Sequence, residues 1–348
     1  MFCPNCGKEI SEKASICINC GESLKPQIVR PNNRFIETET IKKEERPINH
    51  TNDENIKNNT GGVGLMKYVT KKTLKFGITG AVGAACGSVI SDGFMDQGSD
   101  SALGTVGSVA FWVGIIGIGT TIALQMLQNN YLRKPLFSAS MLKTSILVLL
   151  LGGFAGGLAQ VIFGLTSNIS ETVEIISRIL CWGLAGLGIG WGVATFVPNF
   201  PKTRALLAGF LGGCIGGAIF RFTFNIFPES YGRIIGVATL GFFIGLMISF
   251  VEEALREAWL TVVWADNKTT SVALGKKEII LGSSSKADIH LPAEKNYPKI
   301  AAVIEFKNSQ IFIDNKIDNQ RTELKQGSKI TIGEIEITVN MDRRKMLR

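Results

Sequence analysis

Residues 144–166 read TSILVLLLGGFAGGLAQVIFGLT, and residues 205–227 read ALLAGFLGGCIGGAIFRFTFNIF. Each stretch is long enough to cross a hydrocarbon layer of about 30 Å as an α-helix, which rises about 1.5 Å per residue. The first stretch contains no charged residue, and the second contains only Arg221. Apolar runs of this length are typical of membrane-spanning helices, so they predict an integral membrane protein.

The rest of the central region repeats this pattern. Apolar runs predict six spans within a transmembrane domain of residues 67–257, namely 73–92, 103–127, 144–166, 178–198, 205–227 and 233–252. With the N-terminus inside, ten basic residues flank the inner ends: Lys67, Lys71, Lys72, Lys75, Arg133, Lys134, Lys143, Lys202, Arg204 and Arg256. Only Arg178, Arg221 and Arg233 lie near the outer ends. This bias predicts a multi-pass protein of the cell membrane with both termini in the cytoplasm.

Glycine is unusually frequent, at 39 of 348 residues. The motif LGGFAGG at 151–157 recurs as LGGCIGG at 211–217, so the spans look like three repeated helical hairpins. Glycines four residues apart place a flat stripe, a glycine zipper, on a helix and let neighbouring backbones approach in a membrane. Two functions stay open for these glycines: helix packing, or the lining of a pore or substrate groove.

Few ionisable side chains interrupt the spans. Arg221 lies near the outer end of its span and is expected to extend toward the lipid head groups. Asp92, Asp96 and Asp100 are spaced four apart and could attract cations from one helical face, or simply form a solvated outer loop. Away from the span ends, no carboxylate or histidine interrupts the apolar runs, and this disfavours an ion-coupled pump.

The N-terminal segment carries paired cysteines. Residues 3–20 read CPNCGKEISEKASICINC, with the spacing C-x2-C-x10-C-x2-C. Two turns that each present a pair of thiolates can close a tetrahedral metal site, so we expect structural Zn²⁺ at Cys3, Cys6, Cys17 and Cys20. Since no secretory signal opens the sequence, these thiols are expected to stay in the reducing cytoplasm, where paired cysteines usually bind metal.

Residues 1–24 resemble the short zinc ribbon found at the N-terminus of many bacterial membrane proteins. The resemblance implies metal binding and no particular activity. Two lysines in this segment are outnumbered by three glutamates, so no nucleic-acid partner is expected. The following residues 25–66 are rich in Asn, Lys, Glu and Thr. Their few apolar side chains cannot offset the entropy of ordering, which predicts a flexible linker.

After residue 257 the periodicity changes from helical to extended. Short runs rich in Ile and Val, separated by turn residues, predict a β-sandwich over residues 258–341, followed by a basic tail of residues 342–348. The predicted strands are 260–264, 277–281, 300–306, 310–314, 329–332 and 334–339. The fold class is therefore a multi-domain membrane protein, in which a zinc ribbon, a linker and a six-helix bundle precede a β-sandwich.

The segments IILGS (279–283) and ADIHL (287–291) make this β-domain resemble a forkhead-associated (FHA) domain. The resemblance implies a sandwich that recognises phosphothreonine peptides through an Arg, a Ser and His pair, and a later Asn. This chain departs from that pattern, with Ser283, Pro298 and Ala301 at the places of the Arg, the Ser and the His. Because phosphate binding requires charge-assisted donors, we expect the fold without the phosphothreonine site.

No catalytic constellation is visible in the sequence. The two histidines lie far apart, and neither a nucleophile elbow nor a phosphate-binding Gly-Lys-Ser/Thr loop occurs, so no enzyme is expected. The first hypothesis is a membrane-embedded scaffold or sensor that offers its cytoplasmic modules, mainly the C-terminal domain, to protein partners. A channel or transporter built from three hairpins, and a phosphothreonine-dependent adaptor, remain alternatives. Neither a partner's identity nor an oligomeric state follows from the sequence.

Overall fold

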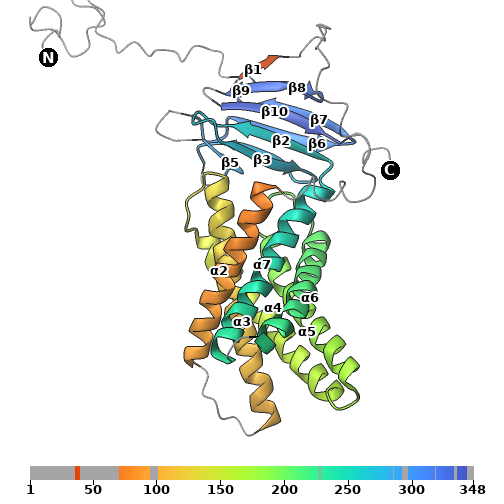
Figure 1. Cartoon of the computed structure of the whole chain (residues 1–348). Coiled ribbons are helices and arrows are strands. Elements are labelled where there is room, and N and C mark those ends of the chain that lie inside the picture. The colour runs from red at the N-terminus through yellow and green to blue at the C-terminus, as the bar shows by residue number, and fades with distance from the viewer. Residues whose placement is uncertain are drawn as a thin grey trace, which may run out of the picture.

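The computed structural model describes residues 36–39, 70–94, 101–226, 229–284, 286–291, 297–317, 319–332 and 335–342. A bundle of long helices carries a β-domain at one end (Figure 1). Six described helices are long and apolar enough to cross a membrane, as the sequence predicts. They are α2 (Lys71–Phe94), α3 (Ala102–Tyr131), α4 (Ala139–Thr166), α5 (Glu171–Ala194), α6 (Lys202–Ile226) and α7 (Glu229–Leu255).

Capping side chains mark the starts of α5 and α3. The predicted fourth span begins at residue 178, but α5 begins at Glu171. The hydroxyl of Ser170 accepts a hydrogen bond from the backbone N–H of Val173 at 3.3 Å and satisfies one free donor of the first turn. Ser101 caps α3 in the same way through the N–H of Gly104 at 3.1 Å.

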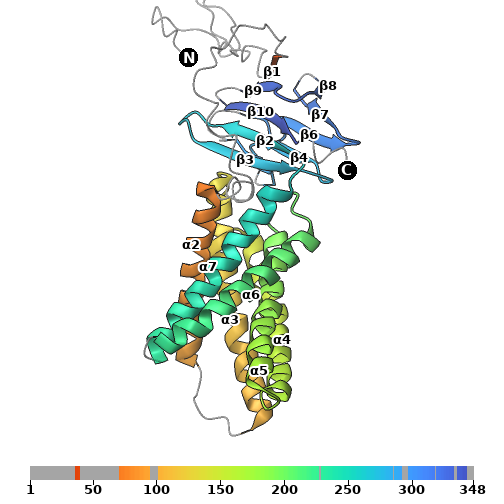
Figure 2. The ribbon, with the colours of Figure 1, turned by 45° about the vertical axis from the view of Figure 1, so that its right-hand side comes forward.

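The six helices pack in sequence order, and α7 closes the ring against α2 (Figure 2). Glycines lie at the closest crossings. A Cβ atom on Gly186 in α5 would overlap the carbonyl oxygen of Gly209 in α6, and one on Gly80 in α2 would overlap that of Gly241 in α7. At these contacts the glycines therefore serve helix packing. The glycine zipper and the three-hairpin repeat stay predictions.

The C-terminal domain is a β-sandwich of two five-stranded sheets, with strand orders β1-β9-β10-β2-β3 and β5-β4-β6-β7-β8. All neighbouring strands are antiparallel except β4 and β5. The strands are β1 (Ile36–Glu39), β2 (Ala258–Val263), β3 (Thr269–Leu274), β4 (Ile279–Gly282), β5 (Ile289–His290), β6 (Ala302–Lys307), β7 (Gln310–Asn315), β8 (Gln320–Leu324), β9 (Lys329–Ile332) and β10 (Ile335–Met341).

Four strands are absent from the sequence-based prediction, and all four lie at sheet edges. β8 exposes every residue except Leu324, so it shows no alternation of apolar and polar residues. β1 comes from the predicted linker and pairs with β9, with Ile36 opposite Ile332. The remaining edge strands are β3 and β5. Apart from β1, the predicted linker and the zinc ribbon lie outside the described residues.

Two main apolar cores hold the molecule together. The core of the β-domain gathers the inner faces of both sheets, for example Leu260, Ile304 and Ile337. The larger core of the bundle gathers side chains from five helices, including Phe76, Leu124, Ile189, Ala208 and Ile244. Each core contains side chains that are almost completely buried.

Candidate functional site

The four cysteines predicted to bind zinc, Cys3, Cys6, Cys17 and Cys20, lie outside the described residues. Their donor set fits the metal, because Zn²⁺ is held in structural sites by four thiolates in two closely spaced pairs. Among the described residues, no group of three or more His, Cys, Asp or Glu side chains could hold a metal ion. The remaining cysteines are Cys86, Cys181 and Cys214, which are free thiols in the helices.

The β-domain is fixed to the bundle through the connection between α3 and α4. Leu132, the residue after α3, is 2% exposed and belongs to the apolar core of the β-domain. Tyr131 packs against the same core. Its phenol oxygen accepts a hydrogen bond from the N–H of Ser271 at 2.8 Å, and its carbonyl accepts one from the hydroxyl of Thr270 at 3.1 Å. The end of a membrane helix is therefore part of the β-domain.

The connection between α5 and α6 makes a second contact with the β-domain. Asn199 has a positive φ of 53°, a conformation that asparagine tolerates better than most residues. Its side-chain amide donates to the carbonyl of Lys277 at 2.9 Å and to that of Ala273 at 3.3 Å. Its side-chain oxygen accepts from the N–H of Lys277 at 2.9 Å. One side chain thus satisfies three backbone groups around the turn between β3 and β4.

Charged residues reinforce the contact between the α3–α4 connection and the β-domain. Arg133 donates to both carboxylate oxygens of Asp266, at 2.5 and 2.6 Å, and its guanidinium lies 4.9 Å from the ring centre of Trp264. The hydrogen bond from Arg133 lowers the pKa of Asp266 to about 2. Lys134 lies 3.9 Å from Asp288, and burial lowers the pKa of this lysine. In the sequence, Arg133 and Lys134 indicate only the topology of the spans, and not this contact.

A buried ion pair lies below the junction, that is, the set of contacts between the bundle and the β-domain. Lys72 at the start of α2 pairs with Glu252 near the end of α7, and both side chains are 7% exposed. The Lys72 ammonium lies 5.3 Å from the ring centre of Tyr131. Glu253 accepts a hydrogen bond from the hydroxyl of Thr70 at 3.1 Å. The sequence does not reveal this role of the two glutamates, because they stand at the end of the last predicted span.

The far end of the bundle holds a second set of ionic contacts. Asp92 in α2 accepts a hydrogen bond from the indole of Trp112 in α3 at 2.9 Å and lies 3.4 Å from Arg233 in α7. Asp92 therefore contacts side chains of two other helices, and it is not simply part of a solvated loop. Asp96 and Asp100 lie outside the described residues. Arg221, expected to extend toward head groups, lies 3.9 Å from Glu174 with its side chain 35% exposed.

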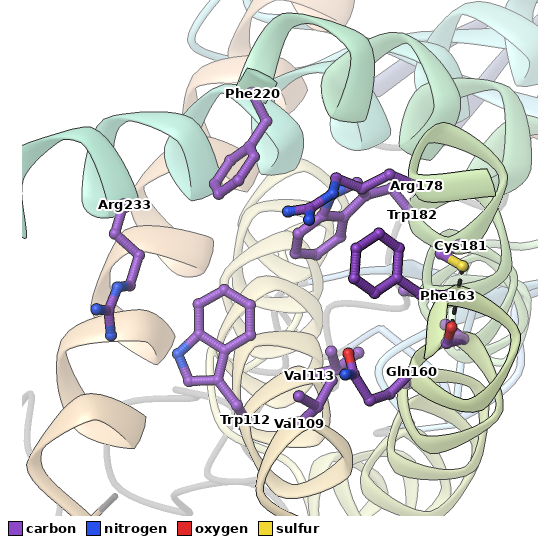
Figure 3. Close-up of a pocket in the computed structure, with 13 residues that line it drawn as sticks. Val109, Trp112, Val113, Gln160, Phe163, Arg178, Cys181, Trp182, Phe220 and Arg233 are labelled. Carbon is purple, nitrogen blue, oxygen red and sulfur yellow. Dashed lines mark hydrogen bonds between the residues drawn. The ribbon is translucent and has the colours of Figure 1, made fainter. Parts of the chain in front are cut away.

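Between these contacts and the bundle core lies a cavity of about 310 Å³ (Figure 3). Aromatic rings line much of it. The ring centres of Trp112 and Trp182 are 6.0 Å apart, and those of Trp182 and Phe220 are 5.3 Å apart. Arg178 and Arg233 supply its charged groups, and the guanidinium of Arg178 lies 4.3 Å from the ring centre of Phe163. The full lining is Val109, Trp112, Val113, Gly156, Ala159, Gln160, Phe163, Arg178, Cys181, Trp182, Ala185, Phe220 and Arg233.

The positions expected to replace the phosphothreonine site of FHA domains have structural partners. The hydroxyl of Ser283 donates to the carbonyl of Tyr297 at 2.8 Å, and its N–H donates to the carbonyl of Pro298 at 3.0 Å. Ala301 is fully buried. The Nδ1 atom of His290 lies 3.2 Å from the carbonyl of Ser284, within the framework of the domain. None of the three substituted positions supplies a charged donor.

Comparisons with known proteins give matches at the two ends of the chain. A zinc-ribbon domain model matches residues 2–24. An FHA domain from a structural and functional analysis of phosphothreonine-dependent FHA interactions is 19% identical, with a TM-score of 0.22, and the match covers 24% of this chain and 97% of that one. The FHA domain of Rv0020c is 20% identical, with a TM-score of 0.22, and the match covers 24% and 94%. The comparison with curated proteins finds no match.

The polypeptide therefore combines three parts. A segment matched by a zinc-ribbon domain model precedes six helices that are long and apolar enough to cross a membrane, and a C-terminal β-sandwich follows them.

Proposed function

We propose that this protein is a non-enzymatic membrane scaffold that holds its β-domain in a fixed position at the cytoplasmic membrane surface for binding to partner proteins. The zinc ribbon, with one structural Zn²⁺ on its four cysteines, serves as a second interaction module on the same side. The proposal places both termini in the cytoplasm, in line with the basic residues that flank the inner helix ends.

The observation that carries this proposal is the junction between bundle and β-domain. A domain joined to a membrane helix by one peptide connection would tumble. Here two further helix connections contact it, through Leu132 in its core and Asn199 at its turn. The buried ion pair between Lys72 and Glu252 joins α2 and α7 directly below. This arrangement favours a module whose orientation to the membrane matters, as expected for a scaffold or a sensor.

Conduction through the bundle receives less support from the geometry. The half of the bundle nearest the β-domain is filled by apolar side chains from five helices, and Leu124, Ile244 and Ile248 there are at most 1% exposed. A continuous aqueous path would have to displace this core. The scaffold is therefore the function that the structure supports best, and the channel stays the alternative.

Proximity labelling in native membranes tests the scaffold. A labelling enzyme fused after residue 348 should mark a defined set of cytoplasmic proteins that the same enzyme on an unrelated membrane anchor does not mark. Tyr131→Phe, which removes one contact at the junction, should change that set, while Tyr231→Phe at the far end of the bundle should not. Labelling identical to that of the unrelated anchor would contradict the proposal, and solute flux through purified protein in liposomes would favour the channel.

A further inference from the structure

The cavity at the far end of the bundle combines cationic and aromatic side chains in a way that packing alone does not require. Among the described residues of its wall, Arg178 and Arg233 are the only ionisable ones besides Cys181, and none is a carboxylate. The Nε atom of Arg178 is buried and has no hydrogen-bond partner among the described residues. An unpaired buried donor on a charged group costs free energy, which an anionic ligand would recover.

Two described carboxylates lie beside the arginines at this end of the bundle. Glu174 lies 3.4 Å from Arg178 and 3.9 Å from Arg221, so one carboxylate is shared by two guanidinium groups. Asp92 lies 3.4 Å from Arg233. Among the described residues, Arg178 therefore has only a shared carboxylate, which leaves its guanidinium able to contact a further anion.

A second cavity, of about 450 Å³, adjoins the first. Cys181 on α5 borders both. The wall of the second cavity is apolar apart from the hydroxyls of Thr166 and Ser177. Each hydroxyl donates a hydrogen bond within its own helix, Thr166 to the carbonyl of Ile162 and Ser177 to the carbonyl of Glu174. The lining residues are Ile162, Thr166, Val173, Ile176, Ser177, Leu180, Cys181, Leu184 and Phe210. An apolar groove beside a cationic pocket matches a molecule with an acidic head and a hydrocarbon tail.

The depth of the arginines identifies the source of such a molecule. Arg178 lies two turns inside the start of α5, and Arg233 lies one turn inside the start of α7. In a spanning helix these positions are near the boundary between head groups and hydrocarbon, where arginine side chains bind lipid phosphates. Figure 3 shows Arg178 next to Trp182, and Arg233 on the other side of the rings of Trp112 and Phe220.

From these observations we propose that the cavity binds one anionic phospholipid of the surrounding bilayer, with its phosphate between Arg178 and Arg233 and an acyl chain in the adjoining apolar groove. The inference goes beyond the scaffold function, because it assigns a ligand to the bundle whatever protein binds the β-domain. The aromatic rings of Trp112 and Trp182 would enclose the glycerol region of the lipid.

Binding to the purified full-length protein in detergent tests the proposal by native mass spectrometry. The probes are phosphatidylglycerol, phosphatidylcholine with the same acyl chains, and free glycerol phosphate. We expect one retained phosphatidylglycerol per chain and at least about tenfold weaker binding of the other two, since a charge-assisted contact and the tail each contribute a factor of this size. Equal retention of phosphatidylcholine, or equal binding of glycerol phosphate, would overturn the assignment.

A matched pair of variants locates the site. Arg178→Gln removes a lining guanidinium and should lower the affinity for phosphatidylglycerol about tenfold. Arg221→Gln removes a guanidinium that contacts the same Glu174 but does not line the cavity, and should leave the affinity unchanged. An equal effect of both substitutions would contradict the site.

Wild-type protein supplies a measurement that does not depend on variant folding. Phosphatidylglycerol with brominated acyl chains should quench the fluorescence of Trp112 and Trp182 more strongly than brominated phosphatidylcholine at the same concentration. Equal quenching by the two lipids would overturn the proposal. Because every readout is lipid binding, failure here would leave the scaffold function standing, and absence of protein partners would leave the lipid site standing.

Discussion

The phenol oxygen of Tyr131, the last residue of α3, accepts a hydrogen bond from the backbone N–H of Ser271 in β3 at 2.8 Å. β3 is an edge strand, and an edge presents backbone groups that could pair with another chain. The bundle covers part of this edge, because Tyr131 also accepts a hydrogen bond through its carbonyl from Thr270. The end of α3 thus covers backbone groups at the edge of β3 that could otherwise pair with a strand of another chain.

Replacing Tyr131 by Phe should loosen this junction. The substitution keeps the ring and removes the acceptor of the Ser271 N–H, which leaves a partly buried donor unsatisfied at a cost of about 1–3 kcal/mol. Hydrogen exchange measured by mass spectrometry should become faster in residues 269–274 and stay unchanged in β7, on the other sheet. Tyr231→Phe, at a side chain that is 68% exposed, is the control. Unchanged exchange in β3 would show that the contact does not hold the domain.

The pair of Lys72 and Glu252 should behave as a buried ion pair. Removing one partner leaves the other charge buried, at a cost of about 3–5 kcal/mol. We therefore expect Lys72→Met or Glu252→Gln alone to lower the apparent melting temperature in detergent, with tryptophan fluorescence as the readout. The double variant Lys72→Met/Glu252→Gln should recover part of that loss. If the losses of the two single variants simply add in the double variant, the two side chains do not interact.

The contact between Arg133 and Asp266 predicts a pH dependence of docking. The hydrogen bond from Arg133 lowers the pKa of Asp266 from 3.8 to about 2 in the docked state. Because the pKa of Asp266 is lowered in the docked state, its carboxylate stabilises docking fully above pH 3.8. This contribution is lost as the pH falls through 2. Hydrogen exchange in residues 264–268, corrected for its intrinsic pH dependence, should therefore be constant between pH 7 and 4. Asp266→Asn should raise it throughout that range, and a transition of the wild type near pH 5 would refute the assignment.

The N-terminal segment should contain one zinc ion per chain. Four thiolates form a closed structural site, and such a short segment depends on the metal for its folding. Elemental analysis of the purified full-length protein should give one zinc per chain. Cys3→Ser together with Cys17→Ser should abolish it, because each knuckle loses a ligand. Cys86→Ser, at an exposed thiol in α2, should retain the metal, and loss of zinc in that variant would place the site elsewhere.

The sequence predicts those parts of the fold that depend on local pattern. The apolar run of residues 144–166 lies entirely within α4, because length and hydropathy alone decide whether a helix can span a membrane. The alternation of apolar and polar residues in 334–339 likewise predicts β10, because one face of that strand is buried. Edge strands escape this reasoning. β8 has no buried face except at Leu324, so its sequence does not show the period of a strand.

The junction and the cavity could not be predicted, since both depend on residues that are distant in sequence. Asn199 carries no signal of its partners, which lie in the turn around Lys277. Leu132 follows an apolar helix and looks like its continuation, yet its side chain belongs to the β-domain. The paired roles of Arg178 and Arg233 arise only when α5 and α7 surround the same space.

The most direct test of the fixed β-domain is a disulfide between the two parts in native membranes. A Cβ atom on Gly275 would lie 3.1 Å from that of Asn199, close enough for a disulfide after slight adjustment. In a protein without Cys86, Cys181 and Cys214, the pair Asn199→Cys/Gly275→Cys should cross-link nearly completely under mild oxidation, as read by mass spectrometry of the linked peptides. The pair Asn199→Cys/Gly327→Cys should not. Equal cross-linking of the two pairs would contradict a β-domain fixed on the membrane bundle.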